Sequence, residues 1–241
     1  MPPPLTLIEK LATKHAAPGS LKPNQPVRSG EIITIRPNHI MTHDNTSAVM
    51  GKFKEIWKGV EAMAQKSDGG VATAIKPRVL DPRQPVFAID HDIQTKTAEN
   101  QGKYAKIESF AREHGIDFYP AGTGISHQVM VEQGYVTPGS MVVGSDSHSN
   151  LYGAACCLGT PVVRTDAASI WATGVTWWQV PPVARCTFKG KLQPGVVGKD
   201  VIIALCGLFN NDEVLNMAVE FVGDADAMKC ALGLVALLRN A

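Results

Sequence analysis

The apolar positions of the chain recur with two periods, which predict helices and strands in alternation. Five apolar residues between 46 and 64 are spaced as on the buried face of a helix: Val49, Phe53, Ile56, Val60 and Met63. Similar spacing and end signals predict further helices over 5–14, 103–115, 127–134, 166–174 and 199–209. Short apolar or alternating runs predict strands over 30–40, 85–90, 116–120, 140–144, 183–192 and 216–224.

This alternation favours the α/β class, and we expect a three-layer α/β/α domain with a predominantly parallel sheet. The pattern divides the chain into three parts. Residues 1–30 form a short helix and an irregular lead-in, 31–224 form the α/β domain, and 225–241 form a final apolar helix that contains AMKCALGLVALLRN. The sequence contains no internal repeat and no low-complexity tract.

Composition narrows the classes of partner. The 241 residues include 23 Lys and Arg against 22 Asp and Glu, so there is no net field to attract nucleic acid or an anionic membrane. The longest apolar runs, such as VIIALCGLF at 201–209, are too short to cross a membrane. The N-terminus lacks the apolar core of a signal peptide and the arginine-rich character of a transit peptide. We therefore expect a cytoplasmic protein that acts on a small molecule.

The five cysteines have no C-x-x-C spacing: Cys156, Cys157, Cys186, Cys206 and Cys230. This pattern favours reduced thiols over a zinc or thioredoxin-like site. The pair Cys156-Cys157 is open to two interpretations, a nucleophilic thiol or a small buried apolar filler. The filler is the stronger one, because no base is evident within the same short loop.

Polar residues follow three of the predicted strands. Asp90 and His91 end the strand PVFAID, His127 follows the loop AGTGIS, and Asp146 and His148 lie in GSDSHS directly after MVV. In a parallel sheet, groups beyond the carboxyl ends of the strands converge on one crevice, where ligands bind. The sequence thus predicts a histidine and carboxylate site at that edge.

The segment GSDSHS itself has two interpretations. In an extended chain Asp146 and His148 point the same way, and the carboxylate would tune the imidazole as a general acid or base. Alternatively, Ser145, Ser147 and Asp146 only satisfy loose backbone groups at the strand end. His43 also has two interpretations. It could belong to the site, or the segment HDN could only cap the helix at 46 through Asp44 or Asn45.

Several ordered segments carry a family resemblance: RPNHIMTHDNTS, AIDHDIQT, AGTGISHQVMVEQG, VVGSDSHSNLYG, GTPVVRTDAASIWATG and the run that begins WWQVPPVARCTFKGKL. Together they resemble the N-terminal part of the aconitase superfamily, in particular its homoaconitase branch. The likeness extends over residues 5–224. It implies an α/β/α first domain of a hydro-lyase that moves water across a tricarboxylate double bond with a [4Fe–4S] cluster.

The resemblance also implies roles for residues of this chain. The positions expected to take part in catalysis are His91, His127, Asp146, His148 and Asp90. His43 and Ser147 are expected to line the site with them. Apart from the resemblance, we expect Ser145, Asn150 and Arg164 to contact substrate; Arg164 is open to two interpretations, a clamp for a substrate carboxylate or a simple pair with Asp166.

The departures from the family are as informative. Its three cluster cysteines lie in a C-T-N context and a C-x-x-C pair, and the 241 residues contain neither. Family segments that supply substrate-binding arginines and a catalytic serine are also missing. A normally glycine-rich stretch reads Ala154-Ala155-Cys156 here. We therefore expect no metal and no cofactor in this chain.

Three functional interpretations follow. In the first, the chain is a lyase or isomerase that dehydrates, isomerises or cyclises a biosynthetic intermediate by acid–base chemistry alone. In a variant of it, two histidines and an aspartate hold a single metal ion. In the second, the chain pairs with another subunit that supplies the cluster, and in the third it is a non-catalytic protein that binds a small carboxylate. We expect homodimerisation through the apolar face that the family's other domains would cover.

Overall fold

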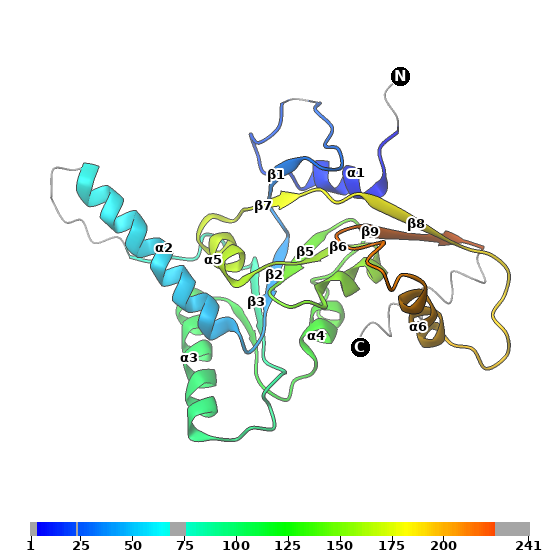
Figure 1. Ribbon diagram of the computed structural model, residues 1–241. Coiled ribbons are helices and arrows are strands. Elements are labelled where there is room, and N and C mark those ends of the chain that lie inside the picture. Colours follow the sequence, from blue (N-terminus) through cyan, green and yellow to red (C-terminus); the bar gives the residue numbers. More distant parts are fainter. Residues whose placement is uncertain (1–3, 23, 68–75, 225–241) are drawn as a thin grey trace.

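The computed structural model describes residues 4–22, 24–67 and 76–224, and its centre is a five-stranded sheet (Figure 1). All neighbouring strands of this sheet are parallel. Their order across the sheet is β4 (Asp117–Tyr119), β3 (Pro85–Ala88), β2 (His39–Thr42), β5 (Met141–Gly144) and β6 (Leu158–Pro161). The predicted predominantly parallel sheet is confirmed.

Helices cover both faces of the sheet. One face carries α2 (Thr46–Ser67), α3 (Ala98–His114) and α5 (Arg164–Thr173), and the other carries α4 (Ser126–Glu132) and the 3₁₀ helix η1 (Ser149–Ala155). Successive strand residues point to opposite faces and so fill two separate cores. Ile40 and Phe87 pack on the first face, around Phe53 and Trp171, whereas Met41 and Val86 pack on the second, around Met130 and Tyr152. The structure is thus the three-layer α/β/α domain that the sequence predicted.

The winding of the chain creates a switch point in the sheet. The chain runs from β2 outward through β3 to β4, then returns to place β5 on the other side of β2. The loops that follow β2 and β5 therefore leave the same edge in opposite directions. Such a switch point opens a crevice at the carboxyl ends of the strands, and this is where open α/β sheets bind ligands.

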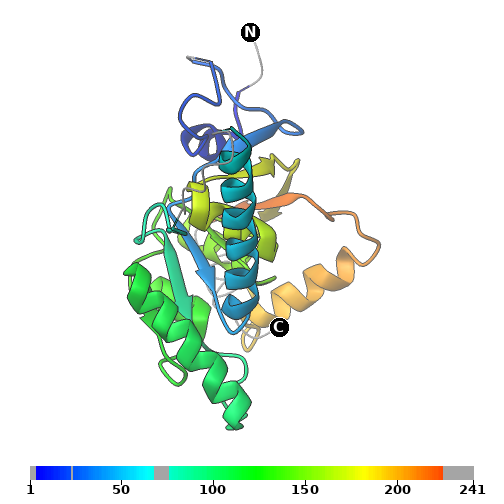
Figure 2. The ribbon, with the colours of Figure 1, turned by 90° about the vertical axis from the view of Figure 1, so that its left-hand side faces the viewer.

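Smaller elements surround this domain. The helix α1 (Leu7–Lys14) begins with a capping box between Thr6 and Glu9, and β1 (Ile32–Ile35) pairs antiparallel with β7 (Thr176–Gln179). A separate parallel pair consists of β8 (Val183–Phe188) and β9 (Ala218–Gly223), which are connected through α6 (Gly198–Leu208). In both views α6 stands apart from the central sheet (Figures 1 and 2). Its residues Ile203 and Leu208 are 60% and 66% exposed.

The structure corrects the sequence-based elements at two places. The predicted strand 30–40 is two strands, β1 and β2, which belong to different sheets. The break occurs at Pro37, which has no N–H to donate, and Asn38 is instead tied to β5 by two hydrogen bonds with Met141. The predicted helix 103–115 begins earlier, at Ala98, because Thr97 caps it by accepting the N–H of Asn100.

Two strands were missed altogether. The strand β6 is only four residues long and contains Gly159 and Pro161, and β7 is a short aromatic segment, so neither has a clear period. No helix in the described ranges is both long enough and apolar enough to cross a membrane. The final helix predicted within 225–241 lies outside the described residues.

Candidate active site

Polar side chains from four connections meet beyond the carboxyl ends of the central strands. His43 follows β2, the pair Asp90-His91 follows β3, His127 lies at the start of α4 after β4, and Asp146 follows β5. Because β2 and β5 are neighbours at the switch point, groups separated by about a hundred residues in sequence become adjacent. The structure thus brings together the residues that the strand-end pattern singled out.

Asp146 is the centre of this cluster. Its Oδ1 accepts hydrogen bonds from His127 Nε2 at 2.8 Å, from the backbone N–H of His148 at 2.8 Å and from His148 Nδ1 at 3.1 Å. Its Oδ2 lies 3.6 Å from His43 Nε2 and 3.5 Å from His91 Nε2. Burial acts to raise the pKa of Asp146, but the hydrogen bonds from His148 and His127 outweigh it and hold the pKa at about 2. The carboxylate is therefore ionised and faces four imidazoles.

The local geometry at Asp146 differs from the sequence-based expectation. Residues 145–148 form a bend and a turn, not an extended chain. Asp146 and His148 still meet, because the carboxylate reaches forward to both the backbone and the ring two residues on. The carboxylate of Asp146 thus satisfies a backbone N–H of the turn, as the capping interpretation expected, and it also holds the imidazole of His148. A catalytic role for this segment stays a prediction.

Asp90 and His91 form the second carboxylate and imidazole pair. Asp90 Oδ1 lies 2.6 Å from His91 Nδ1, while its Oδ2 accepts the N–H of Ser126, the first residue of α4, at 2.6 Å. Burial acts to lower the pKa of His91, but the hydrogen bond and charge of Asp90 raise it above its ordinary value. The side chain of His91 is 47% exposed, and the raised pKa favours its protonated form.

His127 and His43 have the opposite electrostatic character. Burial is the largest effect on both and lowers the pKa of each, which keeps these imidazoles neutral. His127 is fixed at both nitrogens, because Nε2 is bonded to Asp146 and Nδ1 lies 2.9 Å from the hydroxyl of Tyr152 on η1. His43 stacks on His91 with ring centroids 3.9 Å apart. Neighbouring groups whose pKa values move apart are suited to opposite roles in proton transfer.

Asp44 is a site residue that the sequence interpretation missed. Its carboxylate accepts the backbone N–H groups of Asp90, His91 and Asp92, and the hydroxyl of Tyr104. It therefore fixes the turn that carries His91, and the proposed capping of α2 is wrong for this residue. Its position in the sequence just after β2 could have identified it, because that position lies at the same sheet edge as the other polar groups.

The residues expected to contact substrate have unequal surroundings. Ser145 is buried, and the side-chain amide of Asn45 donates to its carbonyl at 2.6 Å and to its hydroxyl at 3.1 Å. Ser147 and Asn150 are exposed in the turn and η1, and Arg164 is exposed at the start of α5 after the edge strand β6. A substrate role for these residues stays a prediction.

The described cysteines do not fit the iron–sulfur cluster that the family resemblance implies. Cys157 is buried beside Ser140, which donates to its sulfur at 3.2 Å, and burial raises the pKa of its thiol. Cys156 is exposed after η1, Cys186 lies on β8 and Cys206 on α6. In the described part of the chain, the two clusters of potential metal ligands contain histidines and aspartates only. No step of the chemistry below therefore involves an iron–sulfur cluster.

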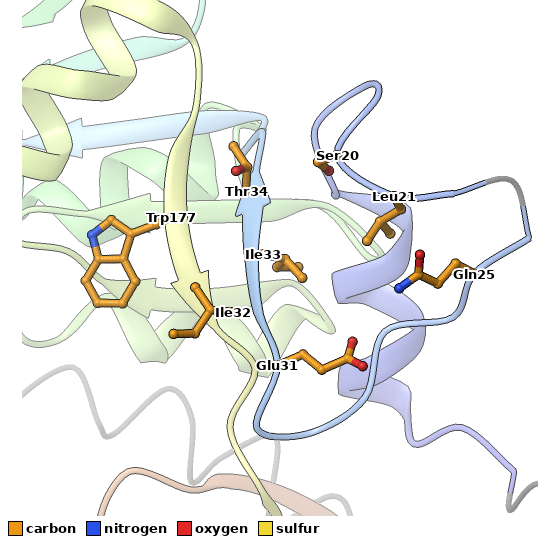
Figure 3. Close-up of a pocket in the computed structure, with 8 residues that line it drawn as sticks. All are labelled: Ser20, Leu21, Gln25, Glu31, Ile32, Ile33, Thr34 and Trp177. Carbon is orange, nitrogen blue, oxygen red and sulfur yellow. The ribbon is translucent and has the colours of Figure 1, made fainter.

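A separate surface hollow lies against β1 and β7 (Figure 3). Its lining residues are Ser20, Leu21, Gln25, Glu31, Ile32, Ile33, Thr34 and Trp177. Glu31 is the one acidic or basic side chain among these lining residues, and none of them is a histidine. The described clusters of histidines and carboxylates lie at the carboxyl edge of the central sheet and not in this hollow.

We expect the unfolding free energy to fall by about 2 kcal/mol through Asp146 as the pH is lowered from 4 to 2, because its pKa falls from 3.8 to about 2 on folding. Because the pKa of Asp146 is lower in the folded than in the unfolded protein, its ionised carboxylate stabilises the fold at a pH above the unfolded-state pKa. This stabilisation is lost as the pH falls through the folded-state pKa. Denaturant unfolding of the wild type and Asp146→Asn across this range measures it. An identical acid dependence in both proteins would contradict the assignment.

An α/β/α domain with histidines held by buried carboxylates at its switch point contains the kinds of group that acid–base chemistry requires, at the edge where such sheets bind ligands. The sequence profile of the aconitase family (aconitate hydratase) matches residues 9–231. The chain therefore belongs to the aconitase family.

Curated relatives agree with this assignment. The chain is 53% identical over 226 residues to "Homoaconitase, mitochondrial" of Neurospora crassa, which is 94% of this chain and 26% of the relative. It is 57% identical over 221 residues to the protein of the same name from Yarrowia lipolytica, which is 92% of this chain and 29% of the relative. The chain thus spans little more than a quarter of these relatives. The names of these relatives place them in mitochondria, so the cytoplasmic location expected for this chain from its sequence stays a prediction.

Proposed function

We propose that this chain is an acid–base lyase or isomerase of the aconitase family, with His91 as the proton donor and His148 as the proton acceptor. The observation that carries the proposal is that both imidazoles are about half exposed, at 47% and 48%, and flank the same buried carboxylate of Asp146. Positioned acids and bases of this kind are sufficient for dehydration, isomerisation or cyclisation of a small biosynthetic intermediate.

The two exposed histidines differ in which nitrogen can act. Asp90 holds His91 Nδ1, whereas the 3.5 Å between His91 Nε2 and Asp146 Oδ2 is too long for a short hydrogen bond, so Nε2–H is the proton that a substrate could receive. Asp146 accepts from His148 Nδ1, so the basic lone pair of neutral His148 is at Nε2. His127 and Asp146 act as positioning residues.

In a dehydration, His148 removes a proton from carbon while the electron pair of that C–H bond forms the C=C bond. The neighbouring C–O bond breaks, and the hydroxyl leaves with the proton of His91 as water. Return of one proton to His91 and loss of one from His148 restore the site. The opposite pKa environments of the stacked pair His43 and His91 support this division of roles, because a neutral neighbour does not oppose the charge on His91.

We also propose that the protein acts in the cytoplasm as a homodimer. The exposed apolar side chains of the β8, α6 and β9 region support self-association: Val197, Ile203, Leu208 and Leu215. The near-balance of charge over the whole sequence supports a small-molecule substrate over nucleic acid or a membrane.

The test is proton exchange at carbon, which needs no knowledge of the final product. Metal-free protein is incubated in D₂O with a panel of small hydroxycarboxylates, and deuterium incorporation is followed by NMR. We expect exchange with at least one compound and an approximately hundredfold slower rate in His91→Asn. His114→Asn, at the far end of α3, is the matched control and should keep the wild-type rate. No exchange with any compound, or an equal loss in both variants, would refute the proposal.

A second candidate function is a subunit of a two-chain hydro-lyase in which the partner supplies an iron–sulfur cluster. The exposed apolar residues of α6 favour it, because a partner subunit could cover them. Purification from the native source without air, followed by iron analysis, discriminates the two. Stoichiometric iron together with a second polypeptide supports this candidate, whereas turnover by the chain alone supports the first.

A further inference from the structure

The histidine cluster contains three buried carboxylates, and no lysine or arginine forms an ion pair with them among the described residues. The side chains of Asp44, Asp90 and Asp146 are only 6%, 8% and 7% exposed. Among the ion pairs of the described residues, the partners of these three carboxylates are histidines only, and no lysine or arginine approaches them. Buried carboxylates of this kind are paired with cations or coordinate metals.

One part of the cluster has the spacing of metal ligands. His127 Nε2 and His148 Nδ1 lie 2.8 and 3.1 Å from the same Asp146 oxygen, Oδ1. Ligand atoms about 2.1 Å from a metal ion in neighbouring octahedral positions are about 3.0 Å apart, and in a tetrahedron about 3.4 Å apart. The two observed separations are close to those between neighbouring ligands of one ion, and the potential ligand atoms of all three residues lie within 4.8 Å of one another.

We propose that His127 Nε2, His148 Nδ1 and Asp146 bind a single divalent first-row transition cation. Two imidazoles and one carboxylate suit Zn²⁺, Co²⁺, Ni²⁺ or Fe²⁺, whereas Mg²⁺ and Ca²⁺ prefer oxygen ligands. The three side chains come from α4 and the turn after β5, and their potential ligand atoms lie within 4.8 Å of one another. Two or three positions around the ion would face the crevice and accept water or a substrate oxygen.

The surroundings of the three ligands suit this role. When Nε2 of His127 binds an ion, its proton lies on Nδ1, and the hydroxyl of Tyr152 at 2.9 Å accepts it. Such a partner fixes the tautomer and the orientation of a ligating ring. The 48% exposure of His148 gives an ion access from solvent.

This site goes beyond the proposed proton transfer and does not depend on it. A cation on His148 Nδ1 takes the place of the proton there, so proton transfer by His148 belongs to the metal-free protein and cation binding to the metal-loaded protein. Binding is therefore measured without substrate, and its failure leaves the exchange experiment untouched.

The experiment is a Co²⁺ titration of the full chain after removal of metals with a chelator. Visible absorption and titration calorimetry should show one Co²⁺ bound per chain, and a hundredfold excess of Mg²⁺ should leave the affinity unchanged. His148→Asn should weaken binding at least tenfold. Its half-exposed position allows the variant to fold, and a thermal melt checks this. His127→Gln provides a second ligand variant with the same expectation.

His91→Asn is the matched control, because His91 belongs to the other histidine and aspartate group of the cluster. It should change the Co²⁺ affinity less than threefold. Absence of both the visible band and binding heat in the wild type overturns the proposal. Unchanged affinity in folded His148→Asn also overturns it, as does an equal loss in His91→Asn, which would move the ion to the other group.

Discussion

Asp146→Asn is expected to lower kcat/KM in the deuterium-exchange reaction about a thousandfold while the protein remains folded. The amide preserves the shape of the side chain but removes the charge that faces four imidazoles. It also places a donor where the carboxylate only accepts, which disfavours the tautomer of His148 with its proton on Nδ1. Both effects act on the proton donor and the proton acceptor together, so this change exceeds the loss in His91→Asn.

The pH profile separates this effect from a merely structural one. Loss of the Asp146 charge should lower the pKa of His91, because that charge contributes to raising it. The limb of the profile that reports the protonated donor should therefore move to lower pH. Asp92→Asn is the matched control, since Asp92 lies in the neighbouring turn and pairs with Lys103 at 3.0 Å instead of with a histidine. Equal losses in the two variants, or a fixed profile, would show that Asp146 does not tune the imidazoles.

The largest loss of stability is expected for Asp44→Ala, about 3–5 kcal/mol of unfolding free energy. Three backbone N–H groups and the hydroxyl of Tyr104 lose their acceptor at once. The pKa of Asp44 is about 2, because these hydrogen bonds outweigh the effect of burial, so an ionised acceptor is lost at neutral pH. Denaturant unfolding with fluorescence or circular dichroism measures the loss.

Two further variants define the cause. Asp44→Asn keeps one acceptor oxygen and should lose an intermediate amount, whereas Asp92→Ala removes an exposed carboxylate and should cost less than about 1 kcal/mol. Because Asp44 fixes the turn of His91, Asp44→Asn should also slow deuterium exchange. A stability close to that of the wild type in Asp44→Ala would mean that water replaces the carboxylate at the turn.

The candidate site was predictable where the signal was local. Asp90 and Asp146 each follow an apolar strand directly, and a parallel sheet places all such residues at one edge. The hydrogen bonds between Asp44 and the turn at 90–92 join residues 46 to 48 positions apart, so no local pattern reveals them. Tyr152 was missed for the same reason, because its contact with His127 depends on how η1 lies against α4.

The fold shows the same division. Periodic helices such as α2 and buried strands such as β3 and β5 were evident, because a period records which face of an element is covered. The division of 30–40 between two sheets depends on its partners: β1 pairs with β7 and β2 pairs with β3 and β5. Short segments such as β6 take their conformation from the strand beside them and contain too few residues for a period.

The sequence by itself therefore determined the α/β class, the edge of the sheet that bears the chemistry and the residue types gathered there. It did so because apolar periods and strand ends are encoded locally. Only the tertiary structure decided which side chains share protons, since the strand order puts β2 beside β5 and so brings His43 and Asp146 together. Burial of each side chain likewise depends on the assembled layers and on no local pattern. Burial lowers the pKa of His127, whereas Asp90 raises the pKa of His91.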